Sequence, residues 1–219
     1  MMKLKLLMIF FFLTLTAKAD YTPLKLYQMI ITAEKIVYGE ITSLDTKTFT
    51  LRIENSLTGE KGSLTIYRFK DWACASRWTE YKIGQKVLLF LYLNKNNGQL
   101  MTMSAGNEGE LPIYKDSIYI NGRALDILPP LEKNKSELSK KEEYFESNHY
   151  TIYGKKFYGY RIDIKEFIQS VLTIKRCFKS GMRKDLDSVK PQLHCPEEIV
   201  EKQNAEDKLF RWTYQKLIK

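Results

Sequence analysis

The sequence predicts a mainly β protein with an α-helical extension: a small closed barrel of five strands, then a β-hairpin and two C-terminal helices. Two observations predict this class. From residue 31 to 104, short stretches of alternating or continuously apolar residues are separated by turn signals, as in small barrels. After residue 163 the apolar residues instead recur at the spacing of a helix face.

The five barrel strands are expected in order along the chain. "EKIVYGEI" is the first, and Gly39 within it is typical of a bulge or a tight barrel bend. "TFTLRIEN" alternates, which indicates a sheet with one solvated face. "SLTIYRF" follows a turn-rich segment, and "KVLLFLYL" is apolar throughout, as in a strand buried on both faces. The fifth strand follows the turn at Asn96-Asn97-Gly98.

Beyond the barrel, a short strand pair is expected at 111–114 and 117–120, and "HYTIYGKKFYGYRI" is typical of a hairpin. Asp163 and Glu166 have the spacing of a capping box, so a helix should start there and end at Gly181. A last helix should begin at Pro196. The apolar stripes of the two helices are Phe167, Ile168, Val171, Leu172 and Phe178, and Ile199, Val200, Leu209, Phe210, Tyr214 and Leu217.

The first residues predict export. A basic start, an apolar run over residues 6–15 and the small-x-small pattern Ala17-Lys18-Ala19 are typical of a signal peptide cut after Ala19. The run is shorter than the about 20 residues of a membrane span, although an uncleaved anchor stays open. The residue after the cut is Asp20, which disfavours a lipoprotein. We therefore expect a secreted or periplasmic protein, of bacterial origin, with no transmembrane span after cleavage.

The expected organisation is a signal peptide at 1–19, the barrel at 20–124, a charged linker or loop at 125–148, and the hairpin with its helical extension at 149–219. The formal charge is +9, and loss of Lys3, Lys5 and Lys18 with the signal peptide leaves +6. This excess is spread over both halves, whereas a nucleic-acid binder concentrates it on one face. A solvated basic surface and no nucleic-acid partner are predicted; weak attraction to an anionic envelope surface stays open.

The chain has three cysteines, an odd count for an oxidising compartment. Cys177 and Cys195 enclose a loop of 17 residues, and a crosslink over such a loop stabilises by about 3 kcal/mol. We predict this disulfide and leave Cys74 as the unpaired thiol, either single or linking two chains.

No catalytic, cofactor-binding or metal-binding motif is present in the sequence. His194 and Cys195 with Cys177 match no usual zinc spacing, so the disulfide is favoured there. Cys74 as a nucleophile would need a base, for which His149 is the candidate. The prediction is therefore a non-enzymatic protein without a cofactor.

The segment "WACASRW" admits two interpretations. If it is extended, Trp72, Cys74, Ser76 and Trp78 share one face, and exposed tryptophans there would form a binding surface together with Arg77. If the tryptophans are buried, they instead close one end of the barrel, which is the favoured interpretation.

These residues also carry a resemblance. The stretch Glu34 to Ile41, the turn Leu57-Thr58-Gly59, Cys74, the run Tyr81 to Phe90 and Gly98-Gln99-Leu100 resemble the oligonucleotide/oligosaccharide-binding (OB) type barrel of the tissue inhibitors of metalloproteinases and netrin-like modules. The resemblance covers about residues 30 to 105. It implies that Cys74 lies on the connection before the fourth strand.

Family inhibitors place an N-terminal cysteine on the target's zinc, but the expected mature terminus here is Asp20-Tyr21-Thr22-Pro23, without Cys-x-Cys. The inhibitory residues are therefore not carried over. We expect a non-enzymatic protein-binding module that contacts another envelope or extracellular protein through Trp72, Arg77 and Trp78. The alternative is a peptidase inhibitor whose wedge is not a cysteine.

Overall fold

The structure is a computed structural model that describes residues 22–106, 108–125, 147–179 and 191–218. The expected signal peptide lies outside these ranges, as do most of the expected charged linker and Gly181. Within the described ranges no helix is both long enough and apolar enough to span a membrane.

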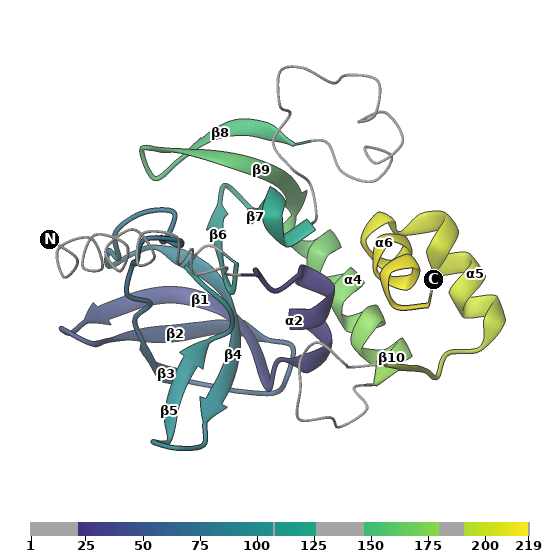
Figure 1. The fold of residues 1–219 in the computed structure, drawn as a ribbon, viewed down its shortest axis with the longest axis horizontal. Coiled ribbons are helices and arrows are strands. Elements are labelled where there is room, and N and C mark those ends of the chain that lie inside the picture. The colour runs from purple at the N-terminus through teal and green to yellow at the C-terminus, as the bar shows by residue number, and fades with distance from the viewer. Residues whose placement is uncertain (1–21, 107, 126–146, 180–190, 219) are drawn as a thin grey trace, which may run out of the picture.

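The predicted barrel is confirmed. Its strands are β1 (Lys35–Leu44), β2 (Thr48–Ser56), β3 (Ser63–Tyr67), β4 (Lys86–Asn94) and β5 (Gln99–Thr102). They follow the order β1-β2-β3-β5-β4, and β4 pairs with β1 to close the ring. The β3–β5 pair is parallel and the others are antiparallel. This is a closed, mixed, OB-like barrel, at the left of Figure 1.

Gly39 lies at a bulge, as predicted. The register of β1 against β2 shifts there, from Tyr38 opposite Asn55 to Gly39 opposite Ile53. A Cβ atom on Gly39 would lie 1.9 Å from the carbonyl oxygen of Arg52, so glycine is needed where the two backbones approach. The bulge lets β1 bend and pair on both edges.

The sheet continues beyond the barrel. β6 (Glu110–Tyr114) pairs with the first half of β4, and β7 (Ser117–Asn121) pairs with β6. A short 3-10 helix, η1 (Gly122–Leu125), ends this part. The hairpin β8 (Asn148–Ile152) and β9 (Lys155–Asp163) then adds to β7, so both sides of the expected boundary at 124 belong to one sheet.

The described residues form four α-helices: α2 (Leu26–Thr32), α4 (Ile164–Cys177), α5 (Glu197–Glu206) and α6 (Lys208–Ile218). Figure 1 shows α2 between the barrel and α4, with α5 and α6 on the far side of α4. One apolar core joins α2, α4 and α6 to the outer faces of β4, β6 and β7. A second fills the barrel and extends to β7, β8 and β9. The helices therefore pack on the barrel rather than forming a separate lobe.

The predicted strand 86–94 is buried on both faces, as its apolar run indicates. Leu88 and Phe90 face the core under the helices, whereas Val87, Leu89 and Leu91 face the barrel interior. This strand is the wall shared by the two cores.

Helix α4 begins as predicted but ends earlier. The Asp163 side chain caps it by accepting from the backbone N–H groups of Lys165 and Glu166. The helix ends at Cys177, because Phe178 is extended and starts β10 (Phe178–Lys179), which pairs with β11 (Gln192–Leu193). The predicted disulfide between Cys177 and Cys195 is present beside this pair. Leu172, placed on the packed stripe, is instead 43% exposed.

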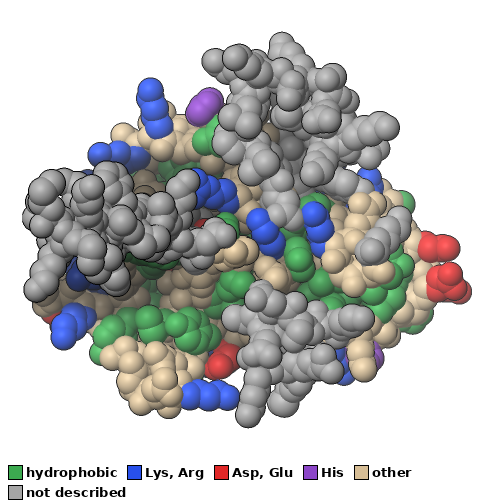
Figure 2. Space-filling model, in the orientation of Figure 1, with side chains coloured by type: hydrophobic (Ala, Val, Ile, Leu, Met, Phe, Trp, Pro, Cys, Tyr) green, Lys and Arg blue, Asp and Glu red, His purple; other side chains and the backbone are tan. Residues whose placement is uncertain are grey.

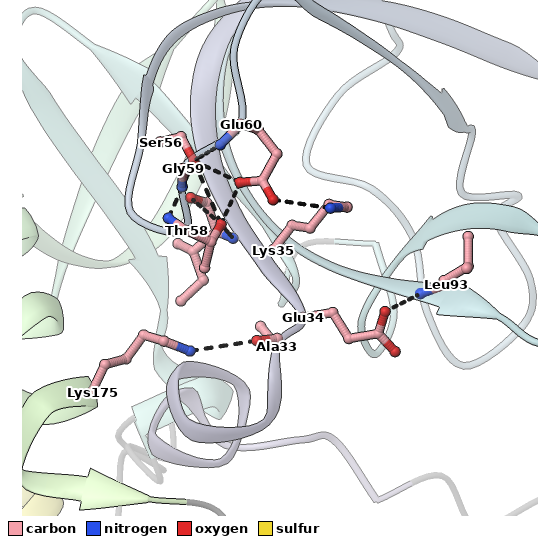
Figure 3. Close-up of polar contacts among 10 residues, drawn as sticks. Ala33, Glu34, Lys35, Ser56, Thr58, Gly59, Glu60, Leu93 and Lys175 are labelled. Atoms are coloured by element: carbon pink, nitrogen blue, oxygen red, sulfur yellow. Dashed lines mark hydrogen bonds and ion pairs between the residues drawn. The ribbon is translucent and has the colours of Figure 1, made fainter.

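The turn after β2 is held by side chains. Ser56 Oγ accepts from the backbone N–H groups of Gly59 and Glu60, both at 2.9 Å, and donates to the Glu60 carboxylate at 2.6 Å. Thr58 also donates to that carboxylate, and Lys35 forms an ion pair with it at 2.9 Å (Figure 3). Burial by itself raises the pKa of Glu60, but the bonds from Ser56, Thr58 and Lys35 outweigh it and lower the pKa to about 2.

This depressed pKa predicts acid sensitivity. The stabilisation from ionised Glu60 should be complete above its usual pKa of 4.5 and should disappear as the pH falls through about 2. The fall from 4.5 to about 2 corresponds to about 3 kcal/mol before solvent screening, which reduces this contribution. We expect the unfolding free energy of Glu60→Gln to fall less steeply between these pH values than that of the wild type. The exposed Glu80→Gln is the matched control, and equal slopes for all three chains would disprove the role of Glu60.

Candidate functional site

The connection between β3 and β4 carries the candidate site. Cys74 lies on it, before the fourth strand, as the resemblance implies. The segment is not extended: Trp72 and Ala75 form a tight turn in which each backbone N–H donates to the other's carbonyl, at 2.9 and 3.1 Å. Asp71 Oδ1 accepts from the backbone N–H of Arg77 at 2.9 Å and closes the loop. Trp72 is 44% exposed on this turn, and Cys74 is exposed beside it.

A buried ion pair anchors the turn from below. Arg77 Nε lies 2.7 Å from Glu110 Oε2, and the two side chains are 2% and 0% exposed. The guanidinium also donates to the carbonyl of Thr79 at 2.8 Å and to Gln85 Oε1 at 3.1 Å. Its Cζ lies 3.9 Å from the ring centroid of Tyr81. Because these bonds fix the side chain in several directions, the backbone at the base of the turn is fixed too.

Tyr81 completes this cluster. Its hydroxyl donates to the Glu110 carboxylate and accepts from the backbone N–H of Phe69 at 2.8 Å. Burial and the neighbouring Glu110 raise the pKa of the Tyr81 hydroxyl, so it stays a hydrogen-bond donor. Burial likewise raises the pKa of Glu110, although Arg77 and Tyr81 oppose this. The cluster is therefore a structural anchor, closed to solvent.

An open pocket of about 470 Å³ lies beside the turn. One wall is the turn itself, a second comes from the end of β7 and η1, and a third comes from β9. Its lining includes Trp72, Cys74, Ser76, Trp78, Glu108, Asn121, Arg123, Lys156, Phe157 and Tyr158. We name this the turn pocket. Three segments that are distant in the sequence thus meet around the exposed tryptophan.

The exposed charges that line the turn pocket are positive. Arg123 and Lys156 are exposed, and no ion pair of either is found within the described ranges. Glu108 is only 3% exposed, and its carboxylate accepts from Ser104 Oγ and from the backbone N–H of Ala105. In Figure 2, Lys and Arg side chains are visible over the β8–β9 hairpin, whereas acidic side chains stand out over α5.

The structure separates the three residues of the predicted binding surface. Trp72 is exposed in the turn pocket, and Trp78 also lines it but is 9% exposed and packs in the barrel core. Arg77 is buried against Glu110 and does not line the pocket, so its place on a binding surface was wrong. The reason is Glu110, a partner 33 residues away that provides an interior counter-charge.

Other pocket residues were missed from the sequence. Asn121, Arg123, Lys156 and Tyr158 reach the site because β7 and β9 pair with each other. No local signal in the sequence marks them, since each lies in an ordinary strand or turn pattern. His149, the candidate base for Cys74, does not line the pocket and packs its ring against Tyr158 at 4.8 Å between centroids. Among the described residues no cluster of three His, Cys, Asp or Glu could hold a metal ion.

No protein-family model matches the chain, and no curated protein matches it. A solved crystal structure, described as that of a proposed RNA-binding protein of the exosome complex, is similar over 72% of this chain and 90% of its own length. The two chains are 12% identical and superpose with a TM-score of 0.25. A likeness at this level carries no argument about function.

Proposed function

We propose that the chain is an exported, non-enzymatic module that binds another envelope or extracellular protein through the turn pocket. The observation that carries the proposal is Trp72: a large aromatic side chain that is 44% exposed on a hydrogen-bonded turn. Exposed tryptophans are common centres of protein–protein interfaces. Because the turn is fixed before contact, little conformational entropy is lost on binding.

We also propose a relationship of the barrel to the tissue inhibitors of metalloproteinases. The support is the closed OB-like barrel and the location of Cys74 between β3 and β4. One further observation favours a peptidase inhibitor as the second candidate. The start of the described chain lies beside the turn pocket, because Lys25 Nζ donates to the carbonyl of Arg123 at 3.0 Å. A wedge formed by residues 22–25 and the turn would not need a cysteine.

The test is crosslinking in the native envelope with a tagged chain, followed by mass spectrometry. Trp72→Ala should reduce the yield of the captured partner about tenfold, which corresponds to 1.4 kcal/mol, while the unfolding free energy changes by less than about 0.5 kcal/mol. Ile83→Ala is the matched control, since Ile83 is 64% exposed on the same connection and does not line the pocket. Equal capture by both variants would contradict the proposal. Capture of a peptidase would instead favour the peptidase-inhibitor function.

A further inference from the structure

Strand β8 lies at the open end of the sheet. The strand order beyond the barrel is β4-β6-β7-β9-β8, so β8 pairs with β9 on one side only (Figure 1). The backbone groups on its other side are paired with no other described strand. An edge of this kind is a template for a further strand.

The hairpin turn determines which backbone groups face outward. Tyr153 and Gly154 form a two-residue turn with φ of 47° and 75°, the conformation of a type I′ hairpin. The pair that flanks such a turn, Ile152 and Lys155, exchanges both hydrogen bonds, and the pairs then alternate. The N–H and C=O groups of Thr151 and His149 therefore point away from β9. Both residues are exposed.

β8 has few of the features that keep other strands from adding to an edge. Natural sheets block their edges with charged side chains, proline, bulges or very short strands. The five residues of β8, Asn148–Ile152, include no Asp, Glu, Lys or Arg and no proline, and their register with β9 has no shift. Apart from its short length, β8 therefore lacks the features that prevent another strand from pairing with it.

The edge is next to the turn pocket. The cross-strand partners of Thr151 and His149 are Lys156 and Tyr158, and both line that pocket. A strand added to β8 would lie about 10 Å from β9, two strand spacings away. A single protein segment that pairs with β8 can therefore also reach the turn pocket.

We propose that β8 binds an extended segment of the partner protein as an additional antiparallel strand; this rests on the proposed function, since it names how the same partner is held. Two residues with outward N–H and C=O groups offer four backbone hydrogen bonds, which an extended peptide satisfies whatever its side chains. A second copy of this chain is a less suitable occupant. One strand pair alone is much smaller than the roughly 1,200 Å² of a stable interface, whereas a partner that also contacts Trp72 gains both surfaces.

The first test uses a defined probe. A capped synthetic peptide with the sequence of residues 147–152 is added at millimolar concentration to the purified chain, and amide hydrogen exchange is followed by NMR. The amides of His149 and Thr151 should exchange about fivefold more slowly, the effect of one net hydrogen bond, while those of Tyr150 and Ile152 should not change. The same peptide with N-methyl groups at alternate residues is the control. Equal effects of both peptides, or none, would overturn the proposal.

The second test uses the captured partner. Thr151→Pro removes the outward N–H, and Thr151→Val keeps it with a side chain of the same shape; proline is tolerated at edge positions whose N–H faces solvent. Capture should fall about tenfold for Thr151→Pro only. If Thr151→Pro still captures the partner but Trp72→Ala does not, strand addition is wrong and the proposed function stands. If both variants still capture the partner, both proposals are wrong. If the wild type forms concentration-dependent dimers in sedimentation and Thr151→Pro does not, the edge binds a second copy of the chain. That result would overturn the proposal that β8 binds a partner protein.

Discussion

Replacement of Arg77 by alanine is expected to lower the free energy of unfolding by about 3–5 kcal/mol. The side chain of Glu110 is 0% exposed, and Arg77 is its partner at 2.7 Å. Removal of the guanidinium leaves a buried carboxylate whose one remaining hydrogen bond within the described residues comes from Tyr81. It also opens the space between the rings of Trp78 and Tyr81. Urea denaturation of the purified variant measures the loss.

A matched triple variant separates charge from packing. Arg77→Met with Glu110→Leu and Tyr81→Phe replaces the cluster by apolar side chains of similar volume, and such replacements are often neutral or stabilising. We expect this variant to recover most of the stability that Arg77→Ala loses. Equal losses in the two variants would mean that the shape of the site, and not an uncompensated charge, decides the effect.

Removal of the disulfide is the second large effect. Cys177 is fully buried at the end of α4, and its bond to Cys195 joins that helix to the segment that leads into α5. The bond closes a loop with a sequence separation of 18, for which the loss of chain entropy in the unfolded state predicts about 3 kcal/mol. Cys177→Ala with Cys195→Ala should lower the unfolding free energy by this amount.

The third cysteine provides the control. Cys74 is exposed and outside the disulfide, so Cys74→Ala should change the unfolding free energy by less than about 0.5 kcal/mol. Addition of a reductant should destabilise the wild type and Cys74→Ala, and should leave the double variant unchanged. The assignment would be contradicted if Cys74→Ala were less stable than the wild type without reductant. It would also be contradicted if reductant changed the stability of the double variant.

The barrel could be predicted because each strand carries its own signal. Phe49 and Leu51 alternate with polar residues along β2, and the apolar run of β4 faces two cores at once. The start of α4 was also readable, since Asp163 acts within one turn of chain. Local chemistry determines these features, so a local pattern reveals them.

Elements that depend on distant contacts were missed. Helix α2 has only seven residues and begins after Lys25, which is no usual cap, so packing against α4 provides most of its stability. The end of α4 was placed too late, because the pairing of Phe178 with Leu193 competes with the helix. The last helix was expected as one element, but the chain becomes extended at Asp207 between α5 and α6.

The site was only partly predictable. Trp72 and Trp78 have similar local surroundings in the sequence, yet one is exposed and the other packs in the core. The difference comes from the turn at 72–75 and from the ion pair of Arg77 with Glu110. Periodicity applies to regular strands and helices, and this connection is neither. Charge alone also suggested that Arg77 lies on the surface, since its counter-charge is remote in sequence.

The contact between α2 and α4 has a consequence for biosynthesis. Lys175 of α4 donates to the carbonyl of Ile30 at the end of α2, across 145 positions of sequence, and Figure 3 shows its bond to Ala33. Helix α2 also packs on β4 and β6, but its contact with α4 forms only after most of the chain has left the ribosome. Contacts of such long range form slowly, because a large loop must close first. Docking of α4 on α2 should therefore be a late step, after the strands of the barrel at residues 35–102 have been synthesised.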